Sequence, residues 1–264
     1  ILEFNADTPT SLLEASVIQW QWKEDVFPEC DQFNGIHEGL VQSWKDIFPK
    51  KGEIHFAGAL ENNEDTGTLQ YLASTAMEAG FSTRVLDMQA LDLQNGRFFD
   101  PAGELVNRCF KLYPWEWMVD ESPDGCLAEM EWLEPIWKLV MSNKAILATL
   151  YELFPDSPYV LPCYLSRPRS GLFCKKPVFS REGHNVSVVD IRDWEEYVRI
   201  AETEGDYNTG AYVYQEYVEP TAYSGRYPVI GSWIIGGEAA GIGIRENRME
   251  VTDNLSEFVP HIIG

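Results

Sequence analysis

The order of strand, helix and strand in residues 53–86 constrains the fold most strongly. Residues 53–59 are apolar and β-prone, residues 66–79 repeat apolar side chains at helical spacing before Gly80, and residues 82–86 form a second apolar run. A helix between two strands favours parallel pairing, because an antiparallel pair needs only a short turn. The segment therefore predicts a βαβ layer. Its acidic loop, residues 60–65, would lie at the carboxyl end of the first strand, where open sheets bind ligands, although it also fits a solvated turn.

The second half of the chain contains a strand–turn–strand pattern. The apolar runs 172–174 and 186–189 flank a polar turn with Gly183, and Lys176 lies at the end of the first predicted strand. Such a turn can aim N–H groups at an anion, while Lys176 and Arg181 add positive charge. A nucleotide-phosphate clamp and an ordinary hairpin with solvated lysines both fit this segment, which matches no Walker pattern.

The net charge narrows the choice of partners. The chain of 264 residues carries a formal charge of −22, so nucleic acid and anionic membranes would be repelled and a cationic small molecule attracted. Its five cysteines are widely spaced without a CxxC pair, which suits reduced thiols in a cytoplasmic protein. No apolar run has transmembrane length, and we expect no signal peptide. The histidines and cysteines lack zinc spacing, so a hard cation held by carboxylates and phosphate is expected.

The chain opens at Ile1 in what reads as the middle of a strand, residues 1–4, and we expect further residues upstream. On an extended chain Glu3 and Asn5 leave the same face, where they could hold magnesium; a surface strand edge followed by a turn asparagine is the alternative. We predict further helices and strands along the chain. The predicted helices span 11–22, 33–48, 127–137, 143–154 and 193–204, a hairpin spans 97–113, and strands span 211–218, 227–235 and 238–246.

Several motifs in combination resemble the glutathionylspermidine synthase family over nearly the whole chain. They are EFNADTPTSLLEA at 3–15, SNKAIL at 142–147, KKPVFSREGHNV at 175–186, PVIGSW at 228–233, GIGIREN at 241–247 and SEFVPH at 256–261. The resemblance implies an α+β ATP-grasp fold preceded by a pre-ATP-grasp-like βαβ layer. We expect residues 1–125 to form the substrate and metal lobe and residues 126–264 the nucleotide-binding region.

The resemblance also implies roles for individual residues. Lys144 and Lys176 match lysines that contact ATP phosphates, with Glu182 and Gly183 in the turn above them. The strand edge that hydrogen-bonds adenine in the family, here called the adenine edge, corresponds to Gln215, Glu216, Tyr217 and Val218. Arg245 matches an arginine near the transferred phosphate. Glu3 and Asn5 match Mg²⁺ ligands. Substrate positions match Thr8 and Thr10 for a glutathione-like peptide, and Glu64, Asp65 and Glu257 for the peptide and a polyamine-like amine.

The chain also departs from the family pattern. Thr8 and Thr10 stand where the synthases place serines, Leu112 replaces a threonine and Val229 a glutamine. There is no sign of the cysteine–histidine amidase domain that some members carry. An arginine and an aspartate that the family places before the EFN motif would lie upstream of Ile1, so the chain as it stands is expected to be catalytically impaired.

Two functions follow from these observations. The first is an ATP-dependent acid–amine ligase that forms an amide through an acyl phosphate. The second is a nucleotide-binding regulatory or scaffold protein that keeps the fold without turnover, which the departures in the substrate region would favour.

Overall fold

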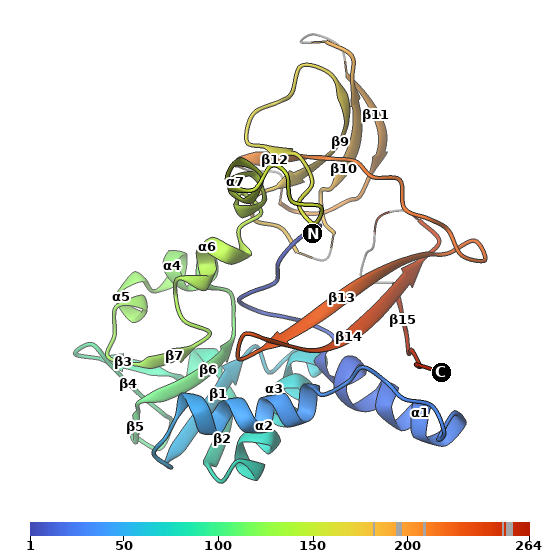
Figure 1. The fold of residues 1–264 in the computed structure, drawn as a ribbon. Coiled ribbons are helices and arrows are strands. Elements are labelled where there is room, and N and C mark those ends of the chain that lie inside the picture. Colours follow the sequence, from blue (N-terminus) through green and yellow to red (C-terminus); the bar gives the residue numbers. More distant parts are fainter. Residues whose placement is uncertain (182, 194–196, 208–209, 250, 252–255) are drawn as a thin grey trace. The chain divides into compact units, whose positions relative to one another are not determined.

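The computed structural model describes residues 1–181, 183–193, 197–207, 210–249, 251 and 256–264 (Figure 1). They form two compact units, each assembled from separated stretches of the chain. We name them after their main sheets. The parallel-sheet unit comprises Ala6–Leu139, Ile230–Ile244 and Phe258–Gly264, and the antiparallel-sheet unit comprises Ile1–Asn5, Val140–Val229 and Arg245–Glu257. The division into functional lobes at residue 125 stays a prediction.

The main sheet of the parallel-sheet unit contains the predicted βαβ segment. Strand β1 (Glu53–Gly58) pairs in parallel with β2 (Ser82–Asp87), and α3 (Asn63–Glu78) connects them, which confirms the prediction. Strands β6 (Arg108–Leu112) and β7 (Glu131–Leu133) extend the sheet in the order β2-β1-β6-β7. Because α3 begins earlier than predicted, Glu64 and Asp65 lie in its first turn and not in a loop.

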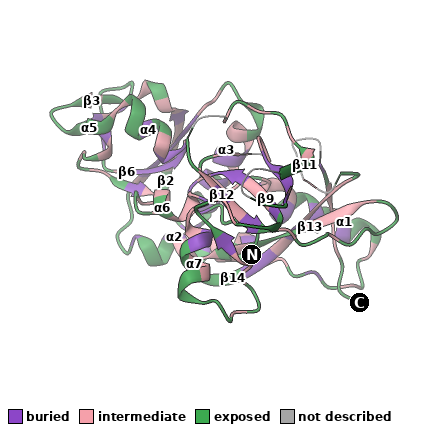
Figure 2. Ribbon diagram, turned by 90° about the horizontal axis from the view of Figure 1, so that it is seen from above, coloured by how far each residue is buried: buried purple, intermediate pink, exposed green. Residues whose placement is uncertain are grey.

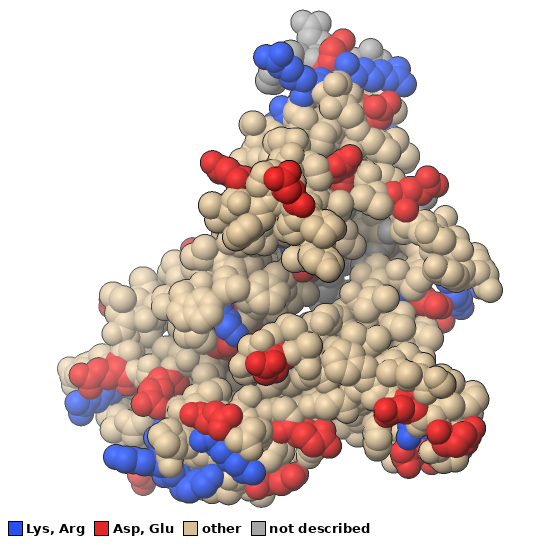
Figure 3. All heavy atoms as spheres, viewed as in Figure 1, with Lys and Arg blue, Asp and Glu red and all other residues tan. Residues whose placement is uncertain are grey.

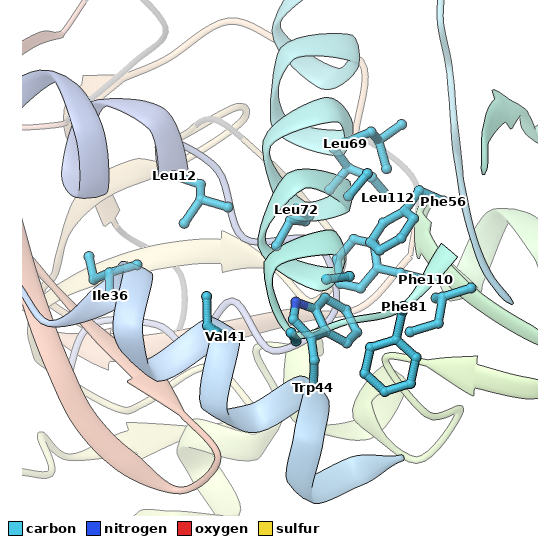
Figure 4. Close-up of a cluster of buried hydrophobic side chains, with 14 of the residues drawn as sticks. Leu12, Ile36, Val41, Trp44, Phe56, Leu69, Leu72, Phe81, Phe110 and Leu112 are labelled. Carbon is cyan, nitrogen blue, oxygen red and sulfur yellow. The ribbon is translucent and has the colours of Figure 1, made fainter. Parts of the chain in front are cut away.

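The core of this unit packs helices onto the sheet. Helix α2 (Ile36–Ile47) presents Trp44 to Phe56 of β1 and Phe110 of β6, and the indole N–H of Trp44 donates to Thr75 Oγ1 at 2.9 Å (Figure 4). Burying each such large apolar side chain contributes about 1.5–3 kcal/mol. The strands β1 and β6 of the parallel-sheet unit are therefore fixed by a well-packed apolar core.

The parallel-sheet unit also contains shorter helices and strands. They are η1 (Glu14–Ile18), α1 (Gln19–Val26), η2 (Met88–Ala90), β3 (Asp92–Gln94), β4 (Arg97–Phe99), β5 (Leu105–Val106), α4 (Trp115–Glu121) and α5 (Pro123–Cys126). The prediction of a helix over 127–137 is wrong. Strand β7 forms there instead, because pairing with β6 lets Trp132 pack in a second apolar cluster against Phe98 and Trp115.

The antiparallel-sheet unit is built on five strands in the order β11-β10-β9-β12-β8. The predicted clamp segment forms β9 (Gly171–Pro177) and β10 (Ser187–Ile191), which pair antiparallel. The other strands and the helix are β8 (Cys163–Tyr164), β11 (Tyr197–Glu202), β12 (Tyr212–Glu216) and α7 (Ile146–Leu153), while the residues of α6 (Lys138–Ser142) are divided between the two units. The predicted helix 193–204 is wrong where the structure describes it, because β11 satisfies its backbone groups on the edge of β10.

A third sheet contains β13 (Tyr227–Ile235), β14 (Glu238–Asn247) and β15 (Glu257–Val259), in that order. The β13–β14 turn has positive φ at Gly236 and Gly237, 61° and 89°, which glycine adopts without a Cβ penalty. This confirms the predicted hairpin around these two glycines. The residues of the three strands are divided between the two units.

Residues 1–4 do not form the predicted strand; no regular element begins before residue 12. Buried residues lie on the strands and on the helices (Figure 2), whereas carboxylates are spread over the face in Figure 3 and form no single patch there. The five cysteines are free thiols. Among the described residues, no helix combines the length and apolar character needed to cross a membrane.

Candidate functional site

Lys176 lies near the end of β9 with its side chain buried, at 8% exposure. Its ammonium group donates to Gln215 Oε1 at 2.8 Å and to the carbonyl oxygen of Leu2 at 2.9 Å. Both acceptors are neutral, and within the described part of the chain no carboxylate contacts this ammonium group. Lys176 is therefore not a solvated lysine of an ordinary hairpin, because the sheet and residues 1–2 cover it.

Gln215 is brought to Lys176 by the register of β12 on β9. Val213 stands opposite Lys176 and Gln215 opposite Cys174, so Gln215 and Lys176 are diagonal neighbours on one face. Gln215 is 1% exposed, and its Nε2 donates to the carbonyl oxygen of Ile1 at 2.9 Å. Side chains of the sheet thus hold the first two residues, which explains how this segment is ordered without strand pairing.

Lys144 is the second buried cation, at 7% exposure. It lies in the turn before α7 and not on the predicted helix; its N–H donates to Val178 O at 2.9 Å. Its Nζ donates to Ser180 O at 2.6 Å and lies 3.3 Å from a carboxylate oxygen of Glu3. Burial lowers the pKa of Lys144, and the charges of Lys176 and Arg181 act in the same direction, while Glu3 opposes them. This end of β9 therefore concentrates positive charge in an acidic protein.

The turn that follows β9 reverses through left-handed residues. Gly183 and Asn185 have φ values of 70° and 55°, and the Gly183 carbonyl accepts from Thr203 Oγ1 at 2.5 Å. Glu182, which the sequence places over the phosphates, lies outside the described residues. The structure therefore locates the turn beside the lysines without describing its acidic residue.

The predicted adenine edge is partly used by the protein itself. Glu216 N–H donates to Pro162 O at 2.7 Å, and Tyr217 N–H donates to Leu172 O at 3.0 Å. Val218, which follows β12, has a 57% exposed side chain. Of the four predicted residues, Gln215 is thus bonded to residue 1, whereas Glu216 and Val218 are exposed.

Arg245 and Glu257 belong to the same compact unit as the lysines. An Arg245 Nη2 lies 3.5 Å from the carbonyl oxygen of Ser256, and Arg226 donates to Glu257 at 2.6 Å. Each has a protein partner in this state. Their predicted roles toward phosphate and amine stay predictions.

The predicted substrate residues Thr8, Thr10, Glu64 and Asp65 all belong to the parallel-sheet unit. Glu64 and Asp65 stand at the start of α3, just beyond the carboxyl end of β1, where Asn62 Oδ1 caps the helix by accepting from Glu64 N–H at 2.9 Å. Thr8 is half-buried and Thr10 exposed, in the loop before η1. Sequence reasoning overlooked Asp7 and Lys111, which anchor this loop; the signal available was a lone lysine inside the apolar strand CFKL.

Glu3 and Asn5, the predicted metal ligands, have exposed side chains. Across the described residues, no group of three or more acidic, histidine or cysteine side chains is arranged to hold a metal ion. The pair offers one carboxylate and one amide oxygen, donors of the kind that Mg²⁺ prefers. The chemistry of this pair fits magnesium only if further oxygens come from elsewhere.

Comparisons with known proteins agree on one family. The family model described as glutathionylspermidine synthase preATP-grasp matches residues 1–264. A Haemophilus influenzae protein, provisionally named an acid–amine ligase, is 38% identical over 99% of this chain and 70% of its own length. The trypanothione synthetase of Crithidia fasciculata is 28% identical over 97% of this chain. The bifunctional glutathionylspermidine synthetase/amidase of Escherichia coli is 25% identical over all of it. The chain spans 43% and 47% of those two relatives.

Several solved structures resemble the chain, and one of them does so at a TM-score of 0.59 and 11% sequence identity. It is a protein of Methylobacillus flagellatus provisionally identified as a gamma-glutamylcysteine synthetase, and the match covers 85% of this chain and 72% of that one. At this identity the likeness concerns the fold alone.

Proposed function

Because the chain belongs to the glutathionylspermidine synthase family, we propose that it serves an ATP-dependent ligase that joins a peptide-like carboxylate to an amine. In this proposal the antiparallel-sheet unit has the ATP-grasp role of binding the nucleotide, and the parallel-sheet unit binds the acid. The reaction would take place in the cytoplasm. Its acid is a glutathione-like peptide and its amine a polyamine-like molecule.

The observation that carries the proposal is the buried charge of Lys176. Burying an ammonium group costs several kcal/mol unless an anion or strong hydrogen bonds compensate, and here the ammonium group has two neutral acceptors. Lys144 stands close enough for the two charges to affect each other, with the exposed Glu3 as its carboxylate partner. Among the described residues here, two lysines and one carboxylate leave a surplus of positive charge, which suits a triphosphate.

The remaining nucleotide contacts follow from what the strands leave open. Adenine recognition at a strand edge needs backbone donors and acceptors, and Glu216 and Tyr217 already use their N–H groups. We therefore assign the base edge to Val218 and to the carbonyl oxygen of Glu216. Gly183 and the turn around it would cover the phosphates.

Glu3 and Asn5 would hold magnesium together with the nucleotide phosphates, since the pair supplies too few oxygens alone. Bound there, the ion would neutralise charge on the transferred phosphoryl group. Lys144 contacts one carboxylate oxygen of Glu3, so the other can face the metal, and the missing ligands would come from phosphate oxygens; metal and nucleotide should therefore bind together. Magnesium titrated calorimetrically without nucleotide should show no tight site.

The chemistry requires activation of the acid. A carboxylate does not condense with an amine at a useful rate in water, so its oxygen first attacks the γ-phosphorus of ATP and ADP leaves. The amine then attacks the acyl carbon and phosphate leaves. Lys144, Lys176 and Arg245 would stabilise the charge that develops on the phosphoryl oxygens. Glu64, Asp65 and Glu257 would bind ammonium groups of the amine, and Thr8 and Thr10 the acid.

The test is ADP release by the protein with a panel of peptide acids and polyamines. The ligase proposal expects release that requires both an acid and an amine, with formation of the amide shown by mass spectrometry. A regulatory nucleotide-binding protein would bind ATP but release no ADP in response to any pair. The departures from the family pattern in the substrate region, at Thr8, Thr10 and Leu112, are the feature that favours this second function.

A further inference from the structure

Asp7 and Lys111 form an ion pair that is buried completely in the parallel-sheet unit, both at 0% exposure. Lys111 Nζ lies 2.5 Å from Asp7 Oδ1 and donates to Tyr113 O at 2.9 Å, with its charge 4.4 Å from the ring centre of Trp115. The second carboxylate oxygen of Asp7 accepts from Trp115 N–H at 2.8 Å. One carboxylate thus ties residue 7 to the end of β6 and to the start of α4.

Stability alone does not account for this pair. Replacing a buried ion pair with apolar residues is often neutral or stabilising, because the charges lose their hydration. Burial lowers the pKa of Lys111 against the influence of Asp7, in agreement with that cost. The pair instead fixes the position of residue 7. Asp7 also accepts a hydrogen bond from the N–H of Trp115 at the start of α4, where the N-cap residue Pro114 makes no side-chain hydrogen bond.

A second observation comes from the loop that Asp7 begins. Ser11 has φ at +62°, a left-handed conformation that is strained for residues other than glycine. Its carbonyl accepts from Ala15 N–H at 3.1 Å, so the following helix holds the far end of the loop. Asp7 holds the near end. Residues 8–10 are therefore fixed between an ionic anchor and a strained residue, a pattern found where a loop is pre-formed for a ligand.

We propose that Asp7 and Lys111 are positioning residues that fix Thr8 and Thr10 for the acid substrate, an inference that rests on the proposed ligase function. Lys111 stands level with Ala57 of β1, near the carboxyl ends of the parallel strands. Neither residue touches the substrate. They act by holding the loop, so that the acid does not have to order it on binding.

The direct test is hydrogen–deuterium exchange of the peptide amides in residues 5–12. Asp7→Asn keeps an acceptor for Trp115 N–H but removes the charge, and we expect exchange in this segment to rise about tenfold or more. The double variant Asp7→Asn/Lys111→Met removes both charges, so its unfolding midpoint should return toward that of the parent protein while exchange stays fast. Unchanged exchange in both variants overturns the inference, whatever the activity.

Kinetics separate positioning from mere support. In both variants the KM for the acid should rise about tenfold or more, while the KM for ATP stays within about twofold. The matched control is Asp100→Asn, which removes another buried carboxylate of this unit, bonded to Arg84 and to the N–H groups of Ala102 and Glu104. It should lower the unfolding midpoint without moving the KM for the acid.

The outcomes are distinguishable. If the double variant regains the parent's KM for the acid together with its stability, the pair is only structural and the inference is wrong. If the parent protein itself releases no ADP with any acid and amine, the ligase function fails and the substrate role of the loop fails with it. The exchange measurement still decides, in that case, whether the pair anchors residues 6–11.

Discussion

Lys111 and Lys176 are buried to nearly the same degree, at 0% and 8% exposure, but their ammonium groups meet different partners. Lys111 is neutralised inside the protein by Asp7 at 2.5 Å. Lys176 binds two neutral oxygens, from Leu2 and Gln215. Among the described residues, the charge of Lys111 is balanced by a carboxylate, whereas Lys176 has only neutral acceptors, which is the basis for proposing that it binds an external anion. Burial alone does not separate these roles; the charge of the partner does.

The largest expected effect is on the stability of the parallel-sheet unit. Lys111→Met leaves the Asp7 carboxylate buried without its counter-ion, which should cost about 3–5 kcal/mol. Chemical denaturation followed by tryptophan fluorescence would measure it, because Trp115 lies beside the pair. A loss below about 1 kcal/mol would show that Asp7 finds another partner and would weaken the contrast with Lys176.

The second prediction concerns Lys176→Met, which should weaken ATP binding about 10- to 100-fold by removing a charge-assisted contact of about 1.5–3 kcal/mol. Stability should change little or rise, because the substitution removes a buried charge whose protein acceptors are both neutral. Lys175→Met is the control: its ammonium group lies 3.9 Å from the ring centre of Tyr212, and it alternates to the opposite face of β9. Equal ATP affinity in both variants would show that β9 and its turn are an ordinary hairpin with no phosphate-binding role.

Lys144 adds a pH test of the same region. Its folded pKa is below 10.5, mainly through burial, and a bound phosphate would favour the charged form. Binding of ATP should therefore take up a proton above the lowered pKa, and affinity should fall as pH rises through it, by at most about tenfold per pH unit. Calorimetry in buffers of different ionisation enthalpy measures the proton. Lys144→Arg keeps the charge, so its affinity should not decline in that window; a parallel decline would exclude Lys144 as the cause.

The smallest expected effect is on the pH dependence of stability and concerns His55, a buried histidine of the parallel-sheet unit. Burial lowers the pKa of His55 below 6.5, with Arg84 acting in the same direction and Glu53 and Asp100 opposing. Neutral His55 therefore supports stability that is present above pH 6.5 and lost as pH falls through the lowered pKa, at no more than about 1.4 kcal/mol per pH unit. His55→Leu should flatten this decline in unfolding free energy, whereas an unchanged slope would assign it to other groups.

Much of the fold followed from local patterns. The segment 53–86 formed a parallel βαβ unit, and the runs on either side of the Gly183 turn and of Gly236–Gly237 formed hairpins. The errors occurred where tertiary pairing outweighed local preference. Residues 197–202 look helical in isolation but pair with β10, and residues 131–133 pair with β6.

The site divides in the same way. The family resemblance singled out Lys144, Lys176 and Gln215, and the structure places Lys176 and Gln215 in hydrogen-bond contact. The sequence did not indicate that Lys176 is buried or that Glu216 and Tyr217 already use their N–H groups. Exposure and hydrogen-bond partners depend on residues far away in the chain, and spacing carries no information about them.

By itself, the sequence determined the family, the parallel and antiparallel segments and the acidic background against which a few lysines stand out. These properties are local or additive, so they can be read residue by residue. Only the tertiary structure decided which lysine has a counter-ion. Asp7 and Lys111 are 104 positions apart, and Lys176 and Leu2 are 174 apart. The energy of a buried charge is set by its neighbours within a few ångströms, and folding alone brings those neighbours together.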